Sequence, residues 1–110
     1  MTVQNVPTLP PENTLDMASQ ARDAATYLKT LAHEGRLMIL CHLCSGEKSV
    51  GTLEELLDIR QAAVSQMLAR LRDEGLVKTR RDGKTVYYSL ADRKTEQVIG
   101  LLYTLFCRAA

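Results

Sequence analysis

Apolar residues recur at helical spacing in two neighbouring segments near the middle of the chain. Leu53, Leu56 and Leu57 follow an i, i+3, i+4 pattern, which predicts a short helix with one face in a core. A second stripe of this kind follows, and Gly75 ends it. Its apolar members are Ala63, Val64, Met67, Leu68 and Leu71. The pattern therefore predicts two short consecutive helices.

The residues after Gly75 read as two paired strands. Residues 77–81 and 85–90 are strand-like, and Asp82-Gly83 stands between them, a dipeptide that suits a two-residue type I′ turn. Two helices followed by a basic hairpin are the order of a winged helix-turn-helix, with a helix for the major groove and a wing for the DNA backbone. We therefore expect a mainly α fold with a small β-hairpin wing. An all-helical domain with an incidental hairpin is the alternative.

Three more helices are expected around this unit, over residues 14–31, 34–44 and 92–107. The middle one is apolar almost all round, which predicts burial in the domain centre. Residues 1–13 contain all three prolines and no strong periodicity, so we expect a mobile N-terminal arm. Residues 14–107 are then a single DNA-binding and dimerisation domain.

The first and last of these helices carry more apolar surface than one small core can cover. Leu15, Ala18, Ala21, Ala25 and Leu28 share one side of the first helix. On the last helix, one face contains Val98, Leu101, Leu102 and Leu105, broadened by Ile99, Tyr103 and Phe106. A homodimer through these helices would bury both faces and match the two-fold symmetry of DNA half-sites. Completion of a monomer core is the alternative.

Charge is unevenly distributed, although the net charge of the 110-residue chain is only +1. Residues 60–84 carry seven basic and three acidic side chains, a balance of +4, whereas residues 1–59 carry four basic and eight acidic ones, a balance of −4. Such an asymmetry fits a DNA-facing edge on a neutral body, and an ordinary solvated surface is the alternative. No membrane-spanning run and no secretory signal is visible, so we expect a cytoplasmic protein that does not enter a membrane.

Base contacts are expected from the exposed N-terminal half of the second helix of the helix-turn-helix. Gln61, Ser65 and Gln66 are the candidates, because glutamine can pair bidentately with adenine and serine is an adaptable donor and acceptor. Met67 is expected to pack in the core rather than to contact DNA. These residue types at these positions indicate readout of double-stranded DNA.

Backbone contacts are expected from basic residues next to this helix and in the wing. Arg60 precedes the helix and has no side-chain oxygen to cap it, so it is a candidate for a phosphate contact. Arg80, Arg81 and Lys84 flank the wing turn and are expected to meet phosphates or the minor groove. Arg36 and Arg70 are weaker candidates, for which a surface salt bridge is an equal alternative.

Three segments together resemble the ArsR (ArsR/SmtB) family of bacterial repressors: LAHEGRLMIL at 31–40, VSQMLARLRDEGLV at 64–77 and RRDGKTVYYSL at 80–90. The resemblance covers about residues 14–107. It implies a cytosolic, homodimeric winged helix-turn-helix protein with its first and last helices at the dimer interface. It also implies a repressor that leaves its operator DNA when an inducer binds.

The chain departs from the metal-sensing members of that family. Its segment VGTLEELL at 50–57 lacks their Cys-x-Cys motif, and no histidine follows Asp92 in the last helix. His33 and His42 are the two histidines of the chain. We therefore expect neither a metal site nor another cofactor.

The cysteines instead resemble those of one subgroup of the family, the sulfide-responsive SqrR and BigR repressors. Cys41 lies on the second expected helix and Cys107 at the end of the last one. The resemblance implies a sensor of reactive sulfur species, persulfides and polysulfides, that links Cys41 to Cys107 and frees operators of sulfide-metabolism genes. Virulence regulators of the HlyU type are similar too, and an ArsR-type response to another oxidant or to a metal is the alternative.

The residues themselves leave the role of the thiols open. Thiolates attack persulfide sulfur, so a sensor needs an accessible thiol and a resolving partner, whereas a cysteine on an apolar helix is usually a small buried hydrophobe. Cys44 completes the motif Cys41-x-x-Cys44, but a disulfide inside a helix would be strained. Cys44 also falls on the apolar stripe of Leu37, Leu40 and Cys41, so we expect it to be a buried bystander. A small helical redox or interaction protein that uses this motif is a further alternative. No catalytic constellation is visible, so an enzyme is not expected.

Overall fold

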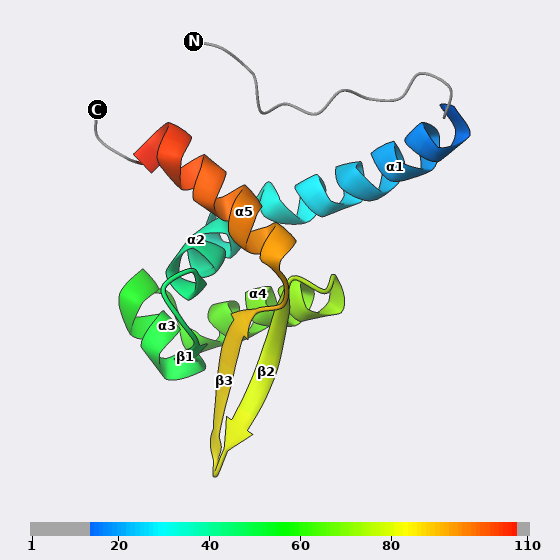
Figure 1. Cartoon of the computed structure of the whole chain (residues 1–110). Coiled ribbons are helices and arrows are strands. Elements are labelled where there is room, and N and C mark those ends of the chain that lie inside the picture. Colours follow the sequence, from blue (N-terminus) through cyan, green and yellow to red (C-terminus); the bar gives the residue numbers. More distant parts are fainter. Residues whose placement is uncertain (1–13, 108–110) are drawn as a thin grey trace.

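The computed structural model describes residues 14–107 (Figure 1), and the expected N-terminal arm, residues 1–13, lies outside them. The elements follow in the order α1 (Thr14–Leu31), α2 (Glu34–Leu43), β1 (Lys48–Ser49), α3 (Val50–Leu57), α4 (Gln61–Asp73), β2 (Val77–Asp82), β3 (Thr85–Leu90) and α5 (Arg93–Leu102), which continues as a π-helical turn over Tyr103–Cys107. In Figure 1 the hairpin of β2 and β3 projects from one end, while α1 and α5 lie at the other. The expected mainly α winged helix-turn-helix is confirmed.

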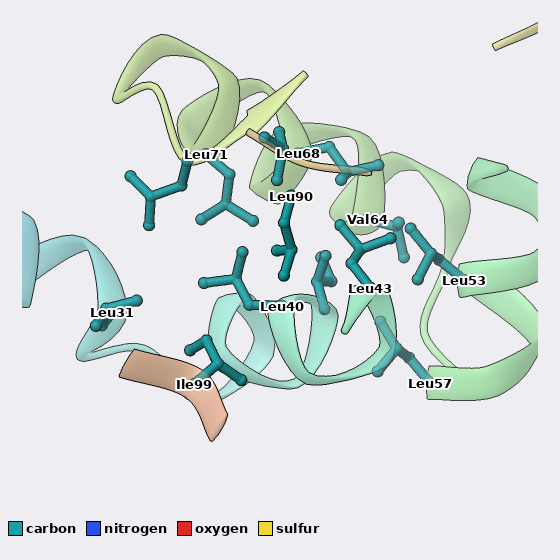
Figure 2. Packing of buried hydrophobic residues seen from close by; sticks show 13 residues of the cluster. Leu31, Leu40, Leu43, Leu53, Leu57, Val64, Leu68, Leu71, Leu90 and Ile99 are labelled. Atoms are coloured by element: carbon teal, nitrogen blue, oxygen red, sulfur yellow. The ribbon is translucent and has the colours of Figure 1, made fainter. Parts of the chain in front are cut away.

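The core lies where α2 meets α3 and α4, and α5 and the base of the wing close it (Figure 2). Ile39 and Leu40 of α2 have no exposed surface, as expected for a helix that is apolar almost all round. Leu68 and Leu71 of α4 and Leu53 of α3 are equally buried. The central helix thus fixes the position of the helix-turn-helix relative to both outer helices.

The predicted apolar face of α3 is wrong in part. On α3, Leu53 and Leu57 are buried but Leu56 is 47% exposed, because it is turned about 100° from Leu57 around the axis and lies beyond the contact with α2 and α4. On α5, the residue that reaches the core is Ile99, with Thr95 buried one turn before it. Leu101 and Leu105, which share the face expected at a dimer interface, are exposed in a single copy.

Helix starts follow the capping chemistry of their side chains. The Asp92 carboxylate accepts a hydrogen bond from Thr95 N at 3.0 Å and so caps α5. Ser49 caps α3 in the same way, accepting from Thr52 N at 3.1 Å. Arg60 occupies the N-cap of α4 and makes no capping hydrogen bond with its side chain. Its guanidinium is therefore left for another partner.

The wing is a three-stranded antiparallel sheet in the order β1-β3-β2. The short strand β1 was not predicted; it pairs Lys48 with Tyr88. The predicted Asp82-Gly83 type I′ turn is also wrong, because Asp82 pairs with Thr85 and the loop is therefore Gly83-Lys84. Gly83 alone in that loop has a positive φ, 63°, as a type II′ turn requires at its first loop position.

Candidate DNA-binding surface and thiol pair

Helix α4 divides into a buried and an exposed face. Its buried residues are Val64, Leu68 and Leu71. The three residues expected to read bases, Gln61, Ser65 and Gln66, are all exposed. The same helix thus anchors itself in the core and presents polar side chains that can reach base edges.

A hollow of 400 Å³ separates the wing from the starts of α3 and α4. It brings together Gln61 and Lys84, two residues that the sequence singled out, with Thr85 and Val86 beside Lys84. Its other wall is the first turn of α3 with its cap, residues 49–51, where backbone N–H groups lack helical partners. The sequence pattern did not predict this wall, although Ser49 is of a residue type that is preferred at helix N-caps.

Gln66 lies on a different hollow from Gln61. It lines a 620 Å³ cleft between α4 and the start of α2, beside His33 and Met67. Met67 is half-buried and packs over Gly35, where a Cβ would collide with the methionine sulfur. The expectation that Met67 packs against the core is therefore confirmed.

The basic residues divide into free and paired ones. Within the described part of the chain, Arg81 and Lys84 form no ion pair and no side-chain hydrogen bond. Arg80 instead binds Glu47, with its Nε donating to the two carboxylate oxygens at 3.1 and 3.2 Å. Of the three wing residues that are expected to contact DNA, Arg81 and Lys84 therefore have no protein partner and Arg80 has one.

The weaker arginine candidates are both engaged in protein contacts. Arg36 Nε donates to Thr30 O at 2.8 Å and so ties the end of α1 to α2. Arg70 of α4 pairs at 3.4 Å with Glu74, the C-cap of that helix, and this is the surface salt bridge that was the alternative for it. Both contacts are structural within one chain.

Cys41 and Cys107 line one apolar cavity of 260 Å³ between α2 and the end of α5. The remaining walls are Leu37, Leu102, Tyr103 and Phe106. Cys41 is half-buried, whereas Cys107 is exposed, and both are free thiols. Burial raises the pKa of the Cys41 thiol, and the neighbouring Cys107 raises it further because two thiolates repel each other.

Cys44 is exposed, so the expectation that it is buried is wrong. Helix α2 ends at Leu43, and Cys44 is its C-cap rather than a member of its apolar stripe. It lines a neighbouring 280 Å³ cavity together with Cys41. The pKa of Cys44 is raised by partial burial, then by Cys41 and Glu96. Cys41 thus lies between two cavities, one leading to each of the other thiols.

Two features are absent from residues 14–107. No three His, Cys, Asp or Glu side chains come together there in a group that could hold a metal ion. No helix in this part of the chain has both the length and the apolar character needed to cross a membrane.

Known proteins resemble this chain in sequence and in structure. Residues 33–79 match the profile described as "Bacterial regulatory protein, arsR family". The biofilm growth-associated repressor of Agrobacterium fabrum is 50% identical over 91 residues, which cover 83% of this chain and 78% of that protein.

Two solved structures of transcriptional regulators are also similar to this chain. The transcriptional repressor BigR from Xylella fastidiosa is 44% identical with a TM-score of 0.79, covering 89% of this chain and all of that one. Reduced HlyU from Vibrio cholerae is 43% identical with a TM-score of 0.81, covering 84% and 98%. These relatives are regulators of transcription, not enzymes. The chain belongs to the ArsR family of bacterial regulatory proteins.

Proposed function

We propose that this chain is a homodimeric, cytoplasmic repressor that releases double-stranded operator DNA when reactive sulfur species link Cys41 to Cys107. The observation that carries the proposal is the apolar cavity that both thiols line, although they are far apart in the sequence. The repressor names of two relatives support the direction of regulation.

The chemistry needs two thiols and one named co-reactant. The exposed Cys107 thiolate attacks the terminal sulfur of a persulfide RSSH; the S–S bond breaks and RS⁻ leaves. Cys41 then attacks the inner sulfur of the Cys107 persulfide and HS⁻ leaves, so that two thiols and RSSH become a disulfide, RSH and H₂S. If both thiols are first persulfidated by two RSSH, the same attack leaves a trisulfide and again expels HS⁻. An apolar cavity suits the link, because the neutral bridge replaces two ionisable groups.

Dimerisation is supported by the apolar surface that one copy leaves uncovered. Leu28 on α1 is 57% exposed and Phe106, next to Cys107, is 80% exposed. In Figure 1, α1 extends away from the rest of the molecule, where a second copy can pack on it. A link between α2 and the end of α5 would thus join the core to the interface and change the spacing of the two α4 helices.

Operator contact is proposed for the exposed residues of α4 and for the free cations near it. Gln61, Ser65 and Gln66 would contact base edges. Arg60 and the wing residues Arg81 and Lys84 would contact phosphates or the minor groove. The hollow shared by Gln61 and Lys84 supports the placement of both on the DNA side.

Removing one wing charge should weaken binding to all sequences alike. Arg81→Ala is expected to lower affinity for operator and unrelated duplexes by similar factors. It should also flatten the slope of log affinity against log salt by about 1.8 per dimer, since each phosphate contact contributes about 0.9. Gln66→Ala, as the comparison, should reduce discrimination between sequences without changing the slope. An unchanged salt slope for Arg81→Ala in fluorescence anisotropy would show that the wing tip does not meet the backbone.

Peptide mass spectrometry after treatment with a persulfide donor tests the proposed sensing reaction. The expected product joins the peptides of Cys41 and Cys107 directly or through extra sulfur, with Cys44 unlinked, and operator binding falls in parallel. A response to peroxide or zinc but not to the persulfide would favour the family function with another signal. A Cys41–Cys44 link with thiol turnover and no operator binding would favour the redox protein.

A further inference from the structure

Glu47 holds the wing arginine Arg80 by several contacts at once. Arg80 Nε donates to both carboxylate oxygens, and Nη2 donates to Oε1 as well. The guanidinium carbon also lies 4.8 Å from the centre of the Tyr87 ring, on the strand beside it. Two of the three guanidinium nitrogens are therefore occupied within the chain. An arginine in this state has little left to offer a phosphate.

The backbone places Glu47 beside the wing. After α2 ends, Gly46 N donates to Leu43 O at 3.1 Å, and Gly46 has a φ of 134°, which turns the chain back. The next residues, Lys48 and Ser49, form β1 and pair with β3. Glu47 directly precedes this strand, on the opposite side of β3 from β2, and its carboxylate reaches across β3 to Arg80. The contact joins residues 33 positions apart.

This carboxylate reduces the positive charge of the wing. Residues 77–86 carry four basic side chains and one acidic one, and Glu47 cancels a further charge at Arg80. Hydrogen bonding by Arg80 lowers the pKa of Glu47, so the carboxylate stays ionised at neutral pH. Both side chains are solvent-exposed, at 53% for Arg80 and 38% for Glu47. Exposed pairs of this kind are weak, and a phosphate can compete for the arginine.

We propose that Glu47 limits the DNA affinity of the repressor by competing with backbone phosphate for Arg80. Phosphate contacts carry no sequence information, so a wing with one more free cation per protomer would bind unrelated DNA more tightly. Glu47 thus lowers the sequence-independent part of the DNA affinity. The base contacts of α4 then account for a larger share of the affinity for operator DNA. Arg80 is a conditional phosphate contact, in contrast to the unpaired Arg81 and Lys84.

The test uses reduced, full-length protein, so its outcome does not depend on the thiol chemistry. Glu47→Gln keeps the shape of the side chain and removes its charge. It is expected to raise affinity for an unrelated duplex about three- to tenfold at fixed salt, because one phosphate contact per protomer is gained. In an Arg80→Ala background the same change should raise affinity only about twofold or less, through the loss of general repulsion.

Glu74→Gln is the matched control, since it removes the same charge from the exposed Arg70–Glu74 pair at the C-terminal end of α4. It should change affinity by less than about twofold, because Glu74 pairs with Arg70 of α4 and not with a basic residue of the wing. The proposal fails if Glu47→Gln gives the same gain with and without Arg80, or gives no gain. It fails equally if Glu47→Gln weakens binding in a protein whose circular dichroism and melting temperature are unchanged, since Glu47 would then position Arg80 for DNA.

Discussion

Replacing Cys107 by serine is expected to leave operator binding intact and to abolish its loss on persulfide treatment. The exposed Cys107 supplies the first nucleophile, and a hydroxyl in its place cannot form a stable link to sulfur. Cys41→Ser should also abolish the response, because a persulfide formed on Cys107 would then lack its resolving thiol in the shared cavity. Operator titrations by fluorescence anisotropy, with and without persulfide, measure both effects.

Cys44→Ser is the matched control for these two variants. Cys44 is also an exposed thiol, but it lines the neighbouring cavity rather than the one that holds Cys107. On persulfide treatment, the Cys44→Ser protein should release operator DNA as the wild-type protein does. If Cys44→Ser abolished the response and Cys107→Ser left it normal, the sensing pair would be Cys41 and Cys44 instead of Cys41 and Cys107.

Leu53→Ala should destabilise the domain strongly, whereas Leu56→Ala on the same helix should not. Leu53 has no exposed surface and packs in the core of α2, α3 and α4, so its truncation leaves a cavity that costs about 2–5 kcal/mol. Leu56 is 47% exposed, and its truncation should cost less than about 1 kcal/mol. For a domain of this size the first change should lower Tm by more than about 10 °C.

Thermal or urea denaturation at one fixed protein concentration compares the two variants, since dimerisation makes stability concentration-dependent. Equal losses for both variants would mean that Leu56 is covered in the native protein. Either a second copy would then cover Leu56, or α3 would lie in a different position that buries it. The pair therefore also tests the exposed face of α3 that the sequence did not predict.

The elements of the fold followed from local signals in the sequence. The apolar character of α2 all round predicts its central position, and Ile39 and Leu40 are indeed fully buried. Asp92 marks the start of α5 because a carboxylate can accept the orphan N–H of Thr95. Such signals act within one or two turns of helix, so they need no knowledge of the rest of the chain.

The features that were missed depend on contacts between distant residues. Strand β1 is two residues long and exists because Lys48 and Ser49 pair with β3. The hairpin loop is one residue later than expected because cross-strand pairing sets the register. The engagement of Arg80 by Glu47 joins residues 33 positions apart. Neither periodicity nor composition carries this information.

The candidate sites show the same division. Exposure of Gln61 and Ser65 followed from the position of the apolar stripe on α4. That Gln61 shares a hollow with Lys84, while Gln66 lies on another, follows from how the wing packs on the helices. Likewise, the spacing of Cys41 and Cys107 in the sequence does not predict that they line one cavity. Their pairing was predicted only from the resemblance to sulfide-responsive repressors.

The proposed function requires that a link between Cys41 and Cys107 releases operator DNA. The most direct measurement is the operator affinity of purified protein in which mass spectrometry shows this link, compared with the same sample after reduction. The operator affinity of the linked protein should be lower by at least about tenfold, a coupling of about 1.4 kcal/mol, and reduction should restore it. Equal affinity of the linked and the reduced protein would show that the link does not control DNA binding.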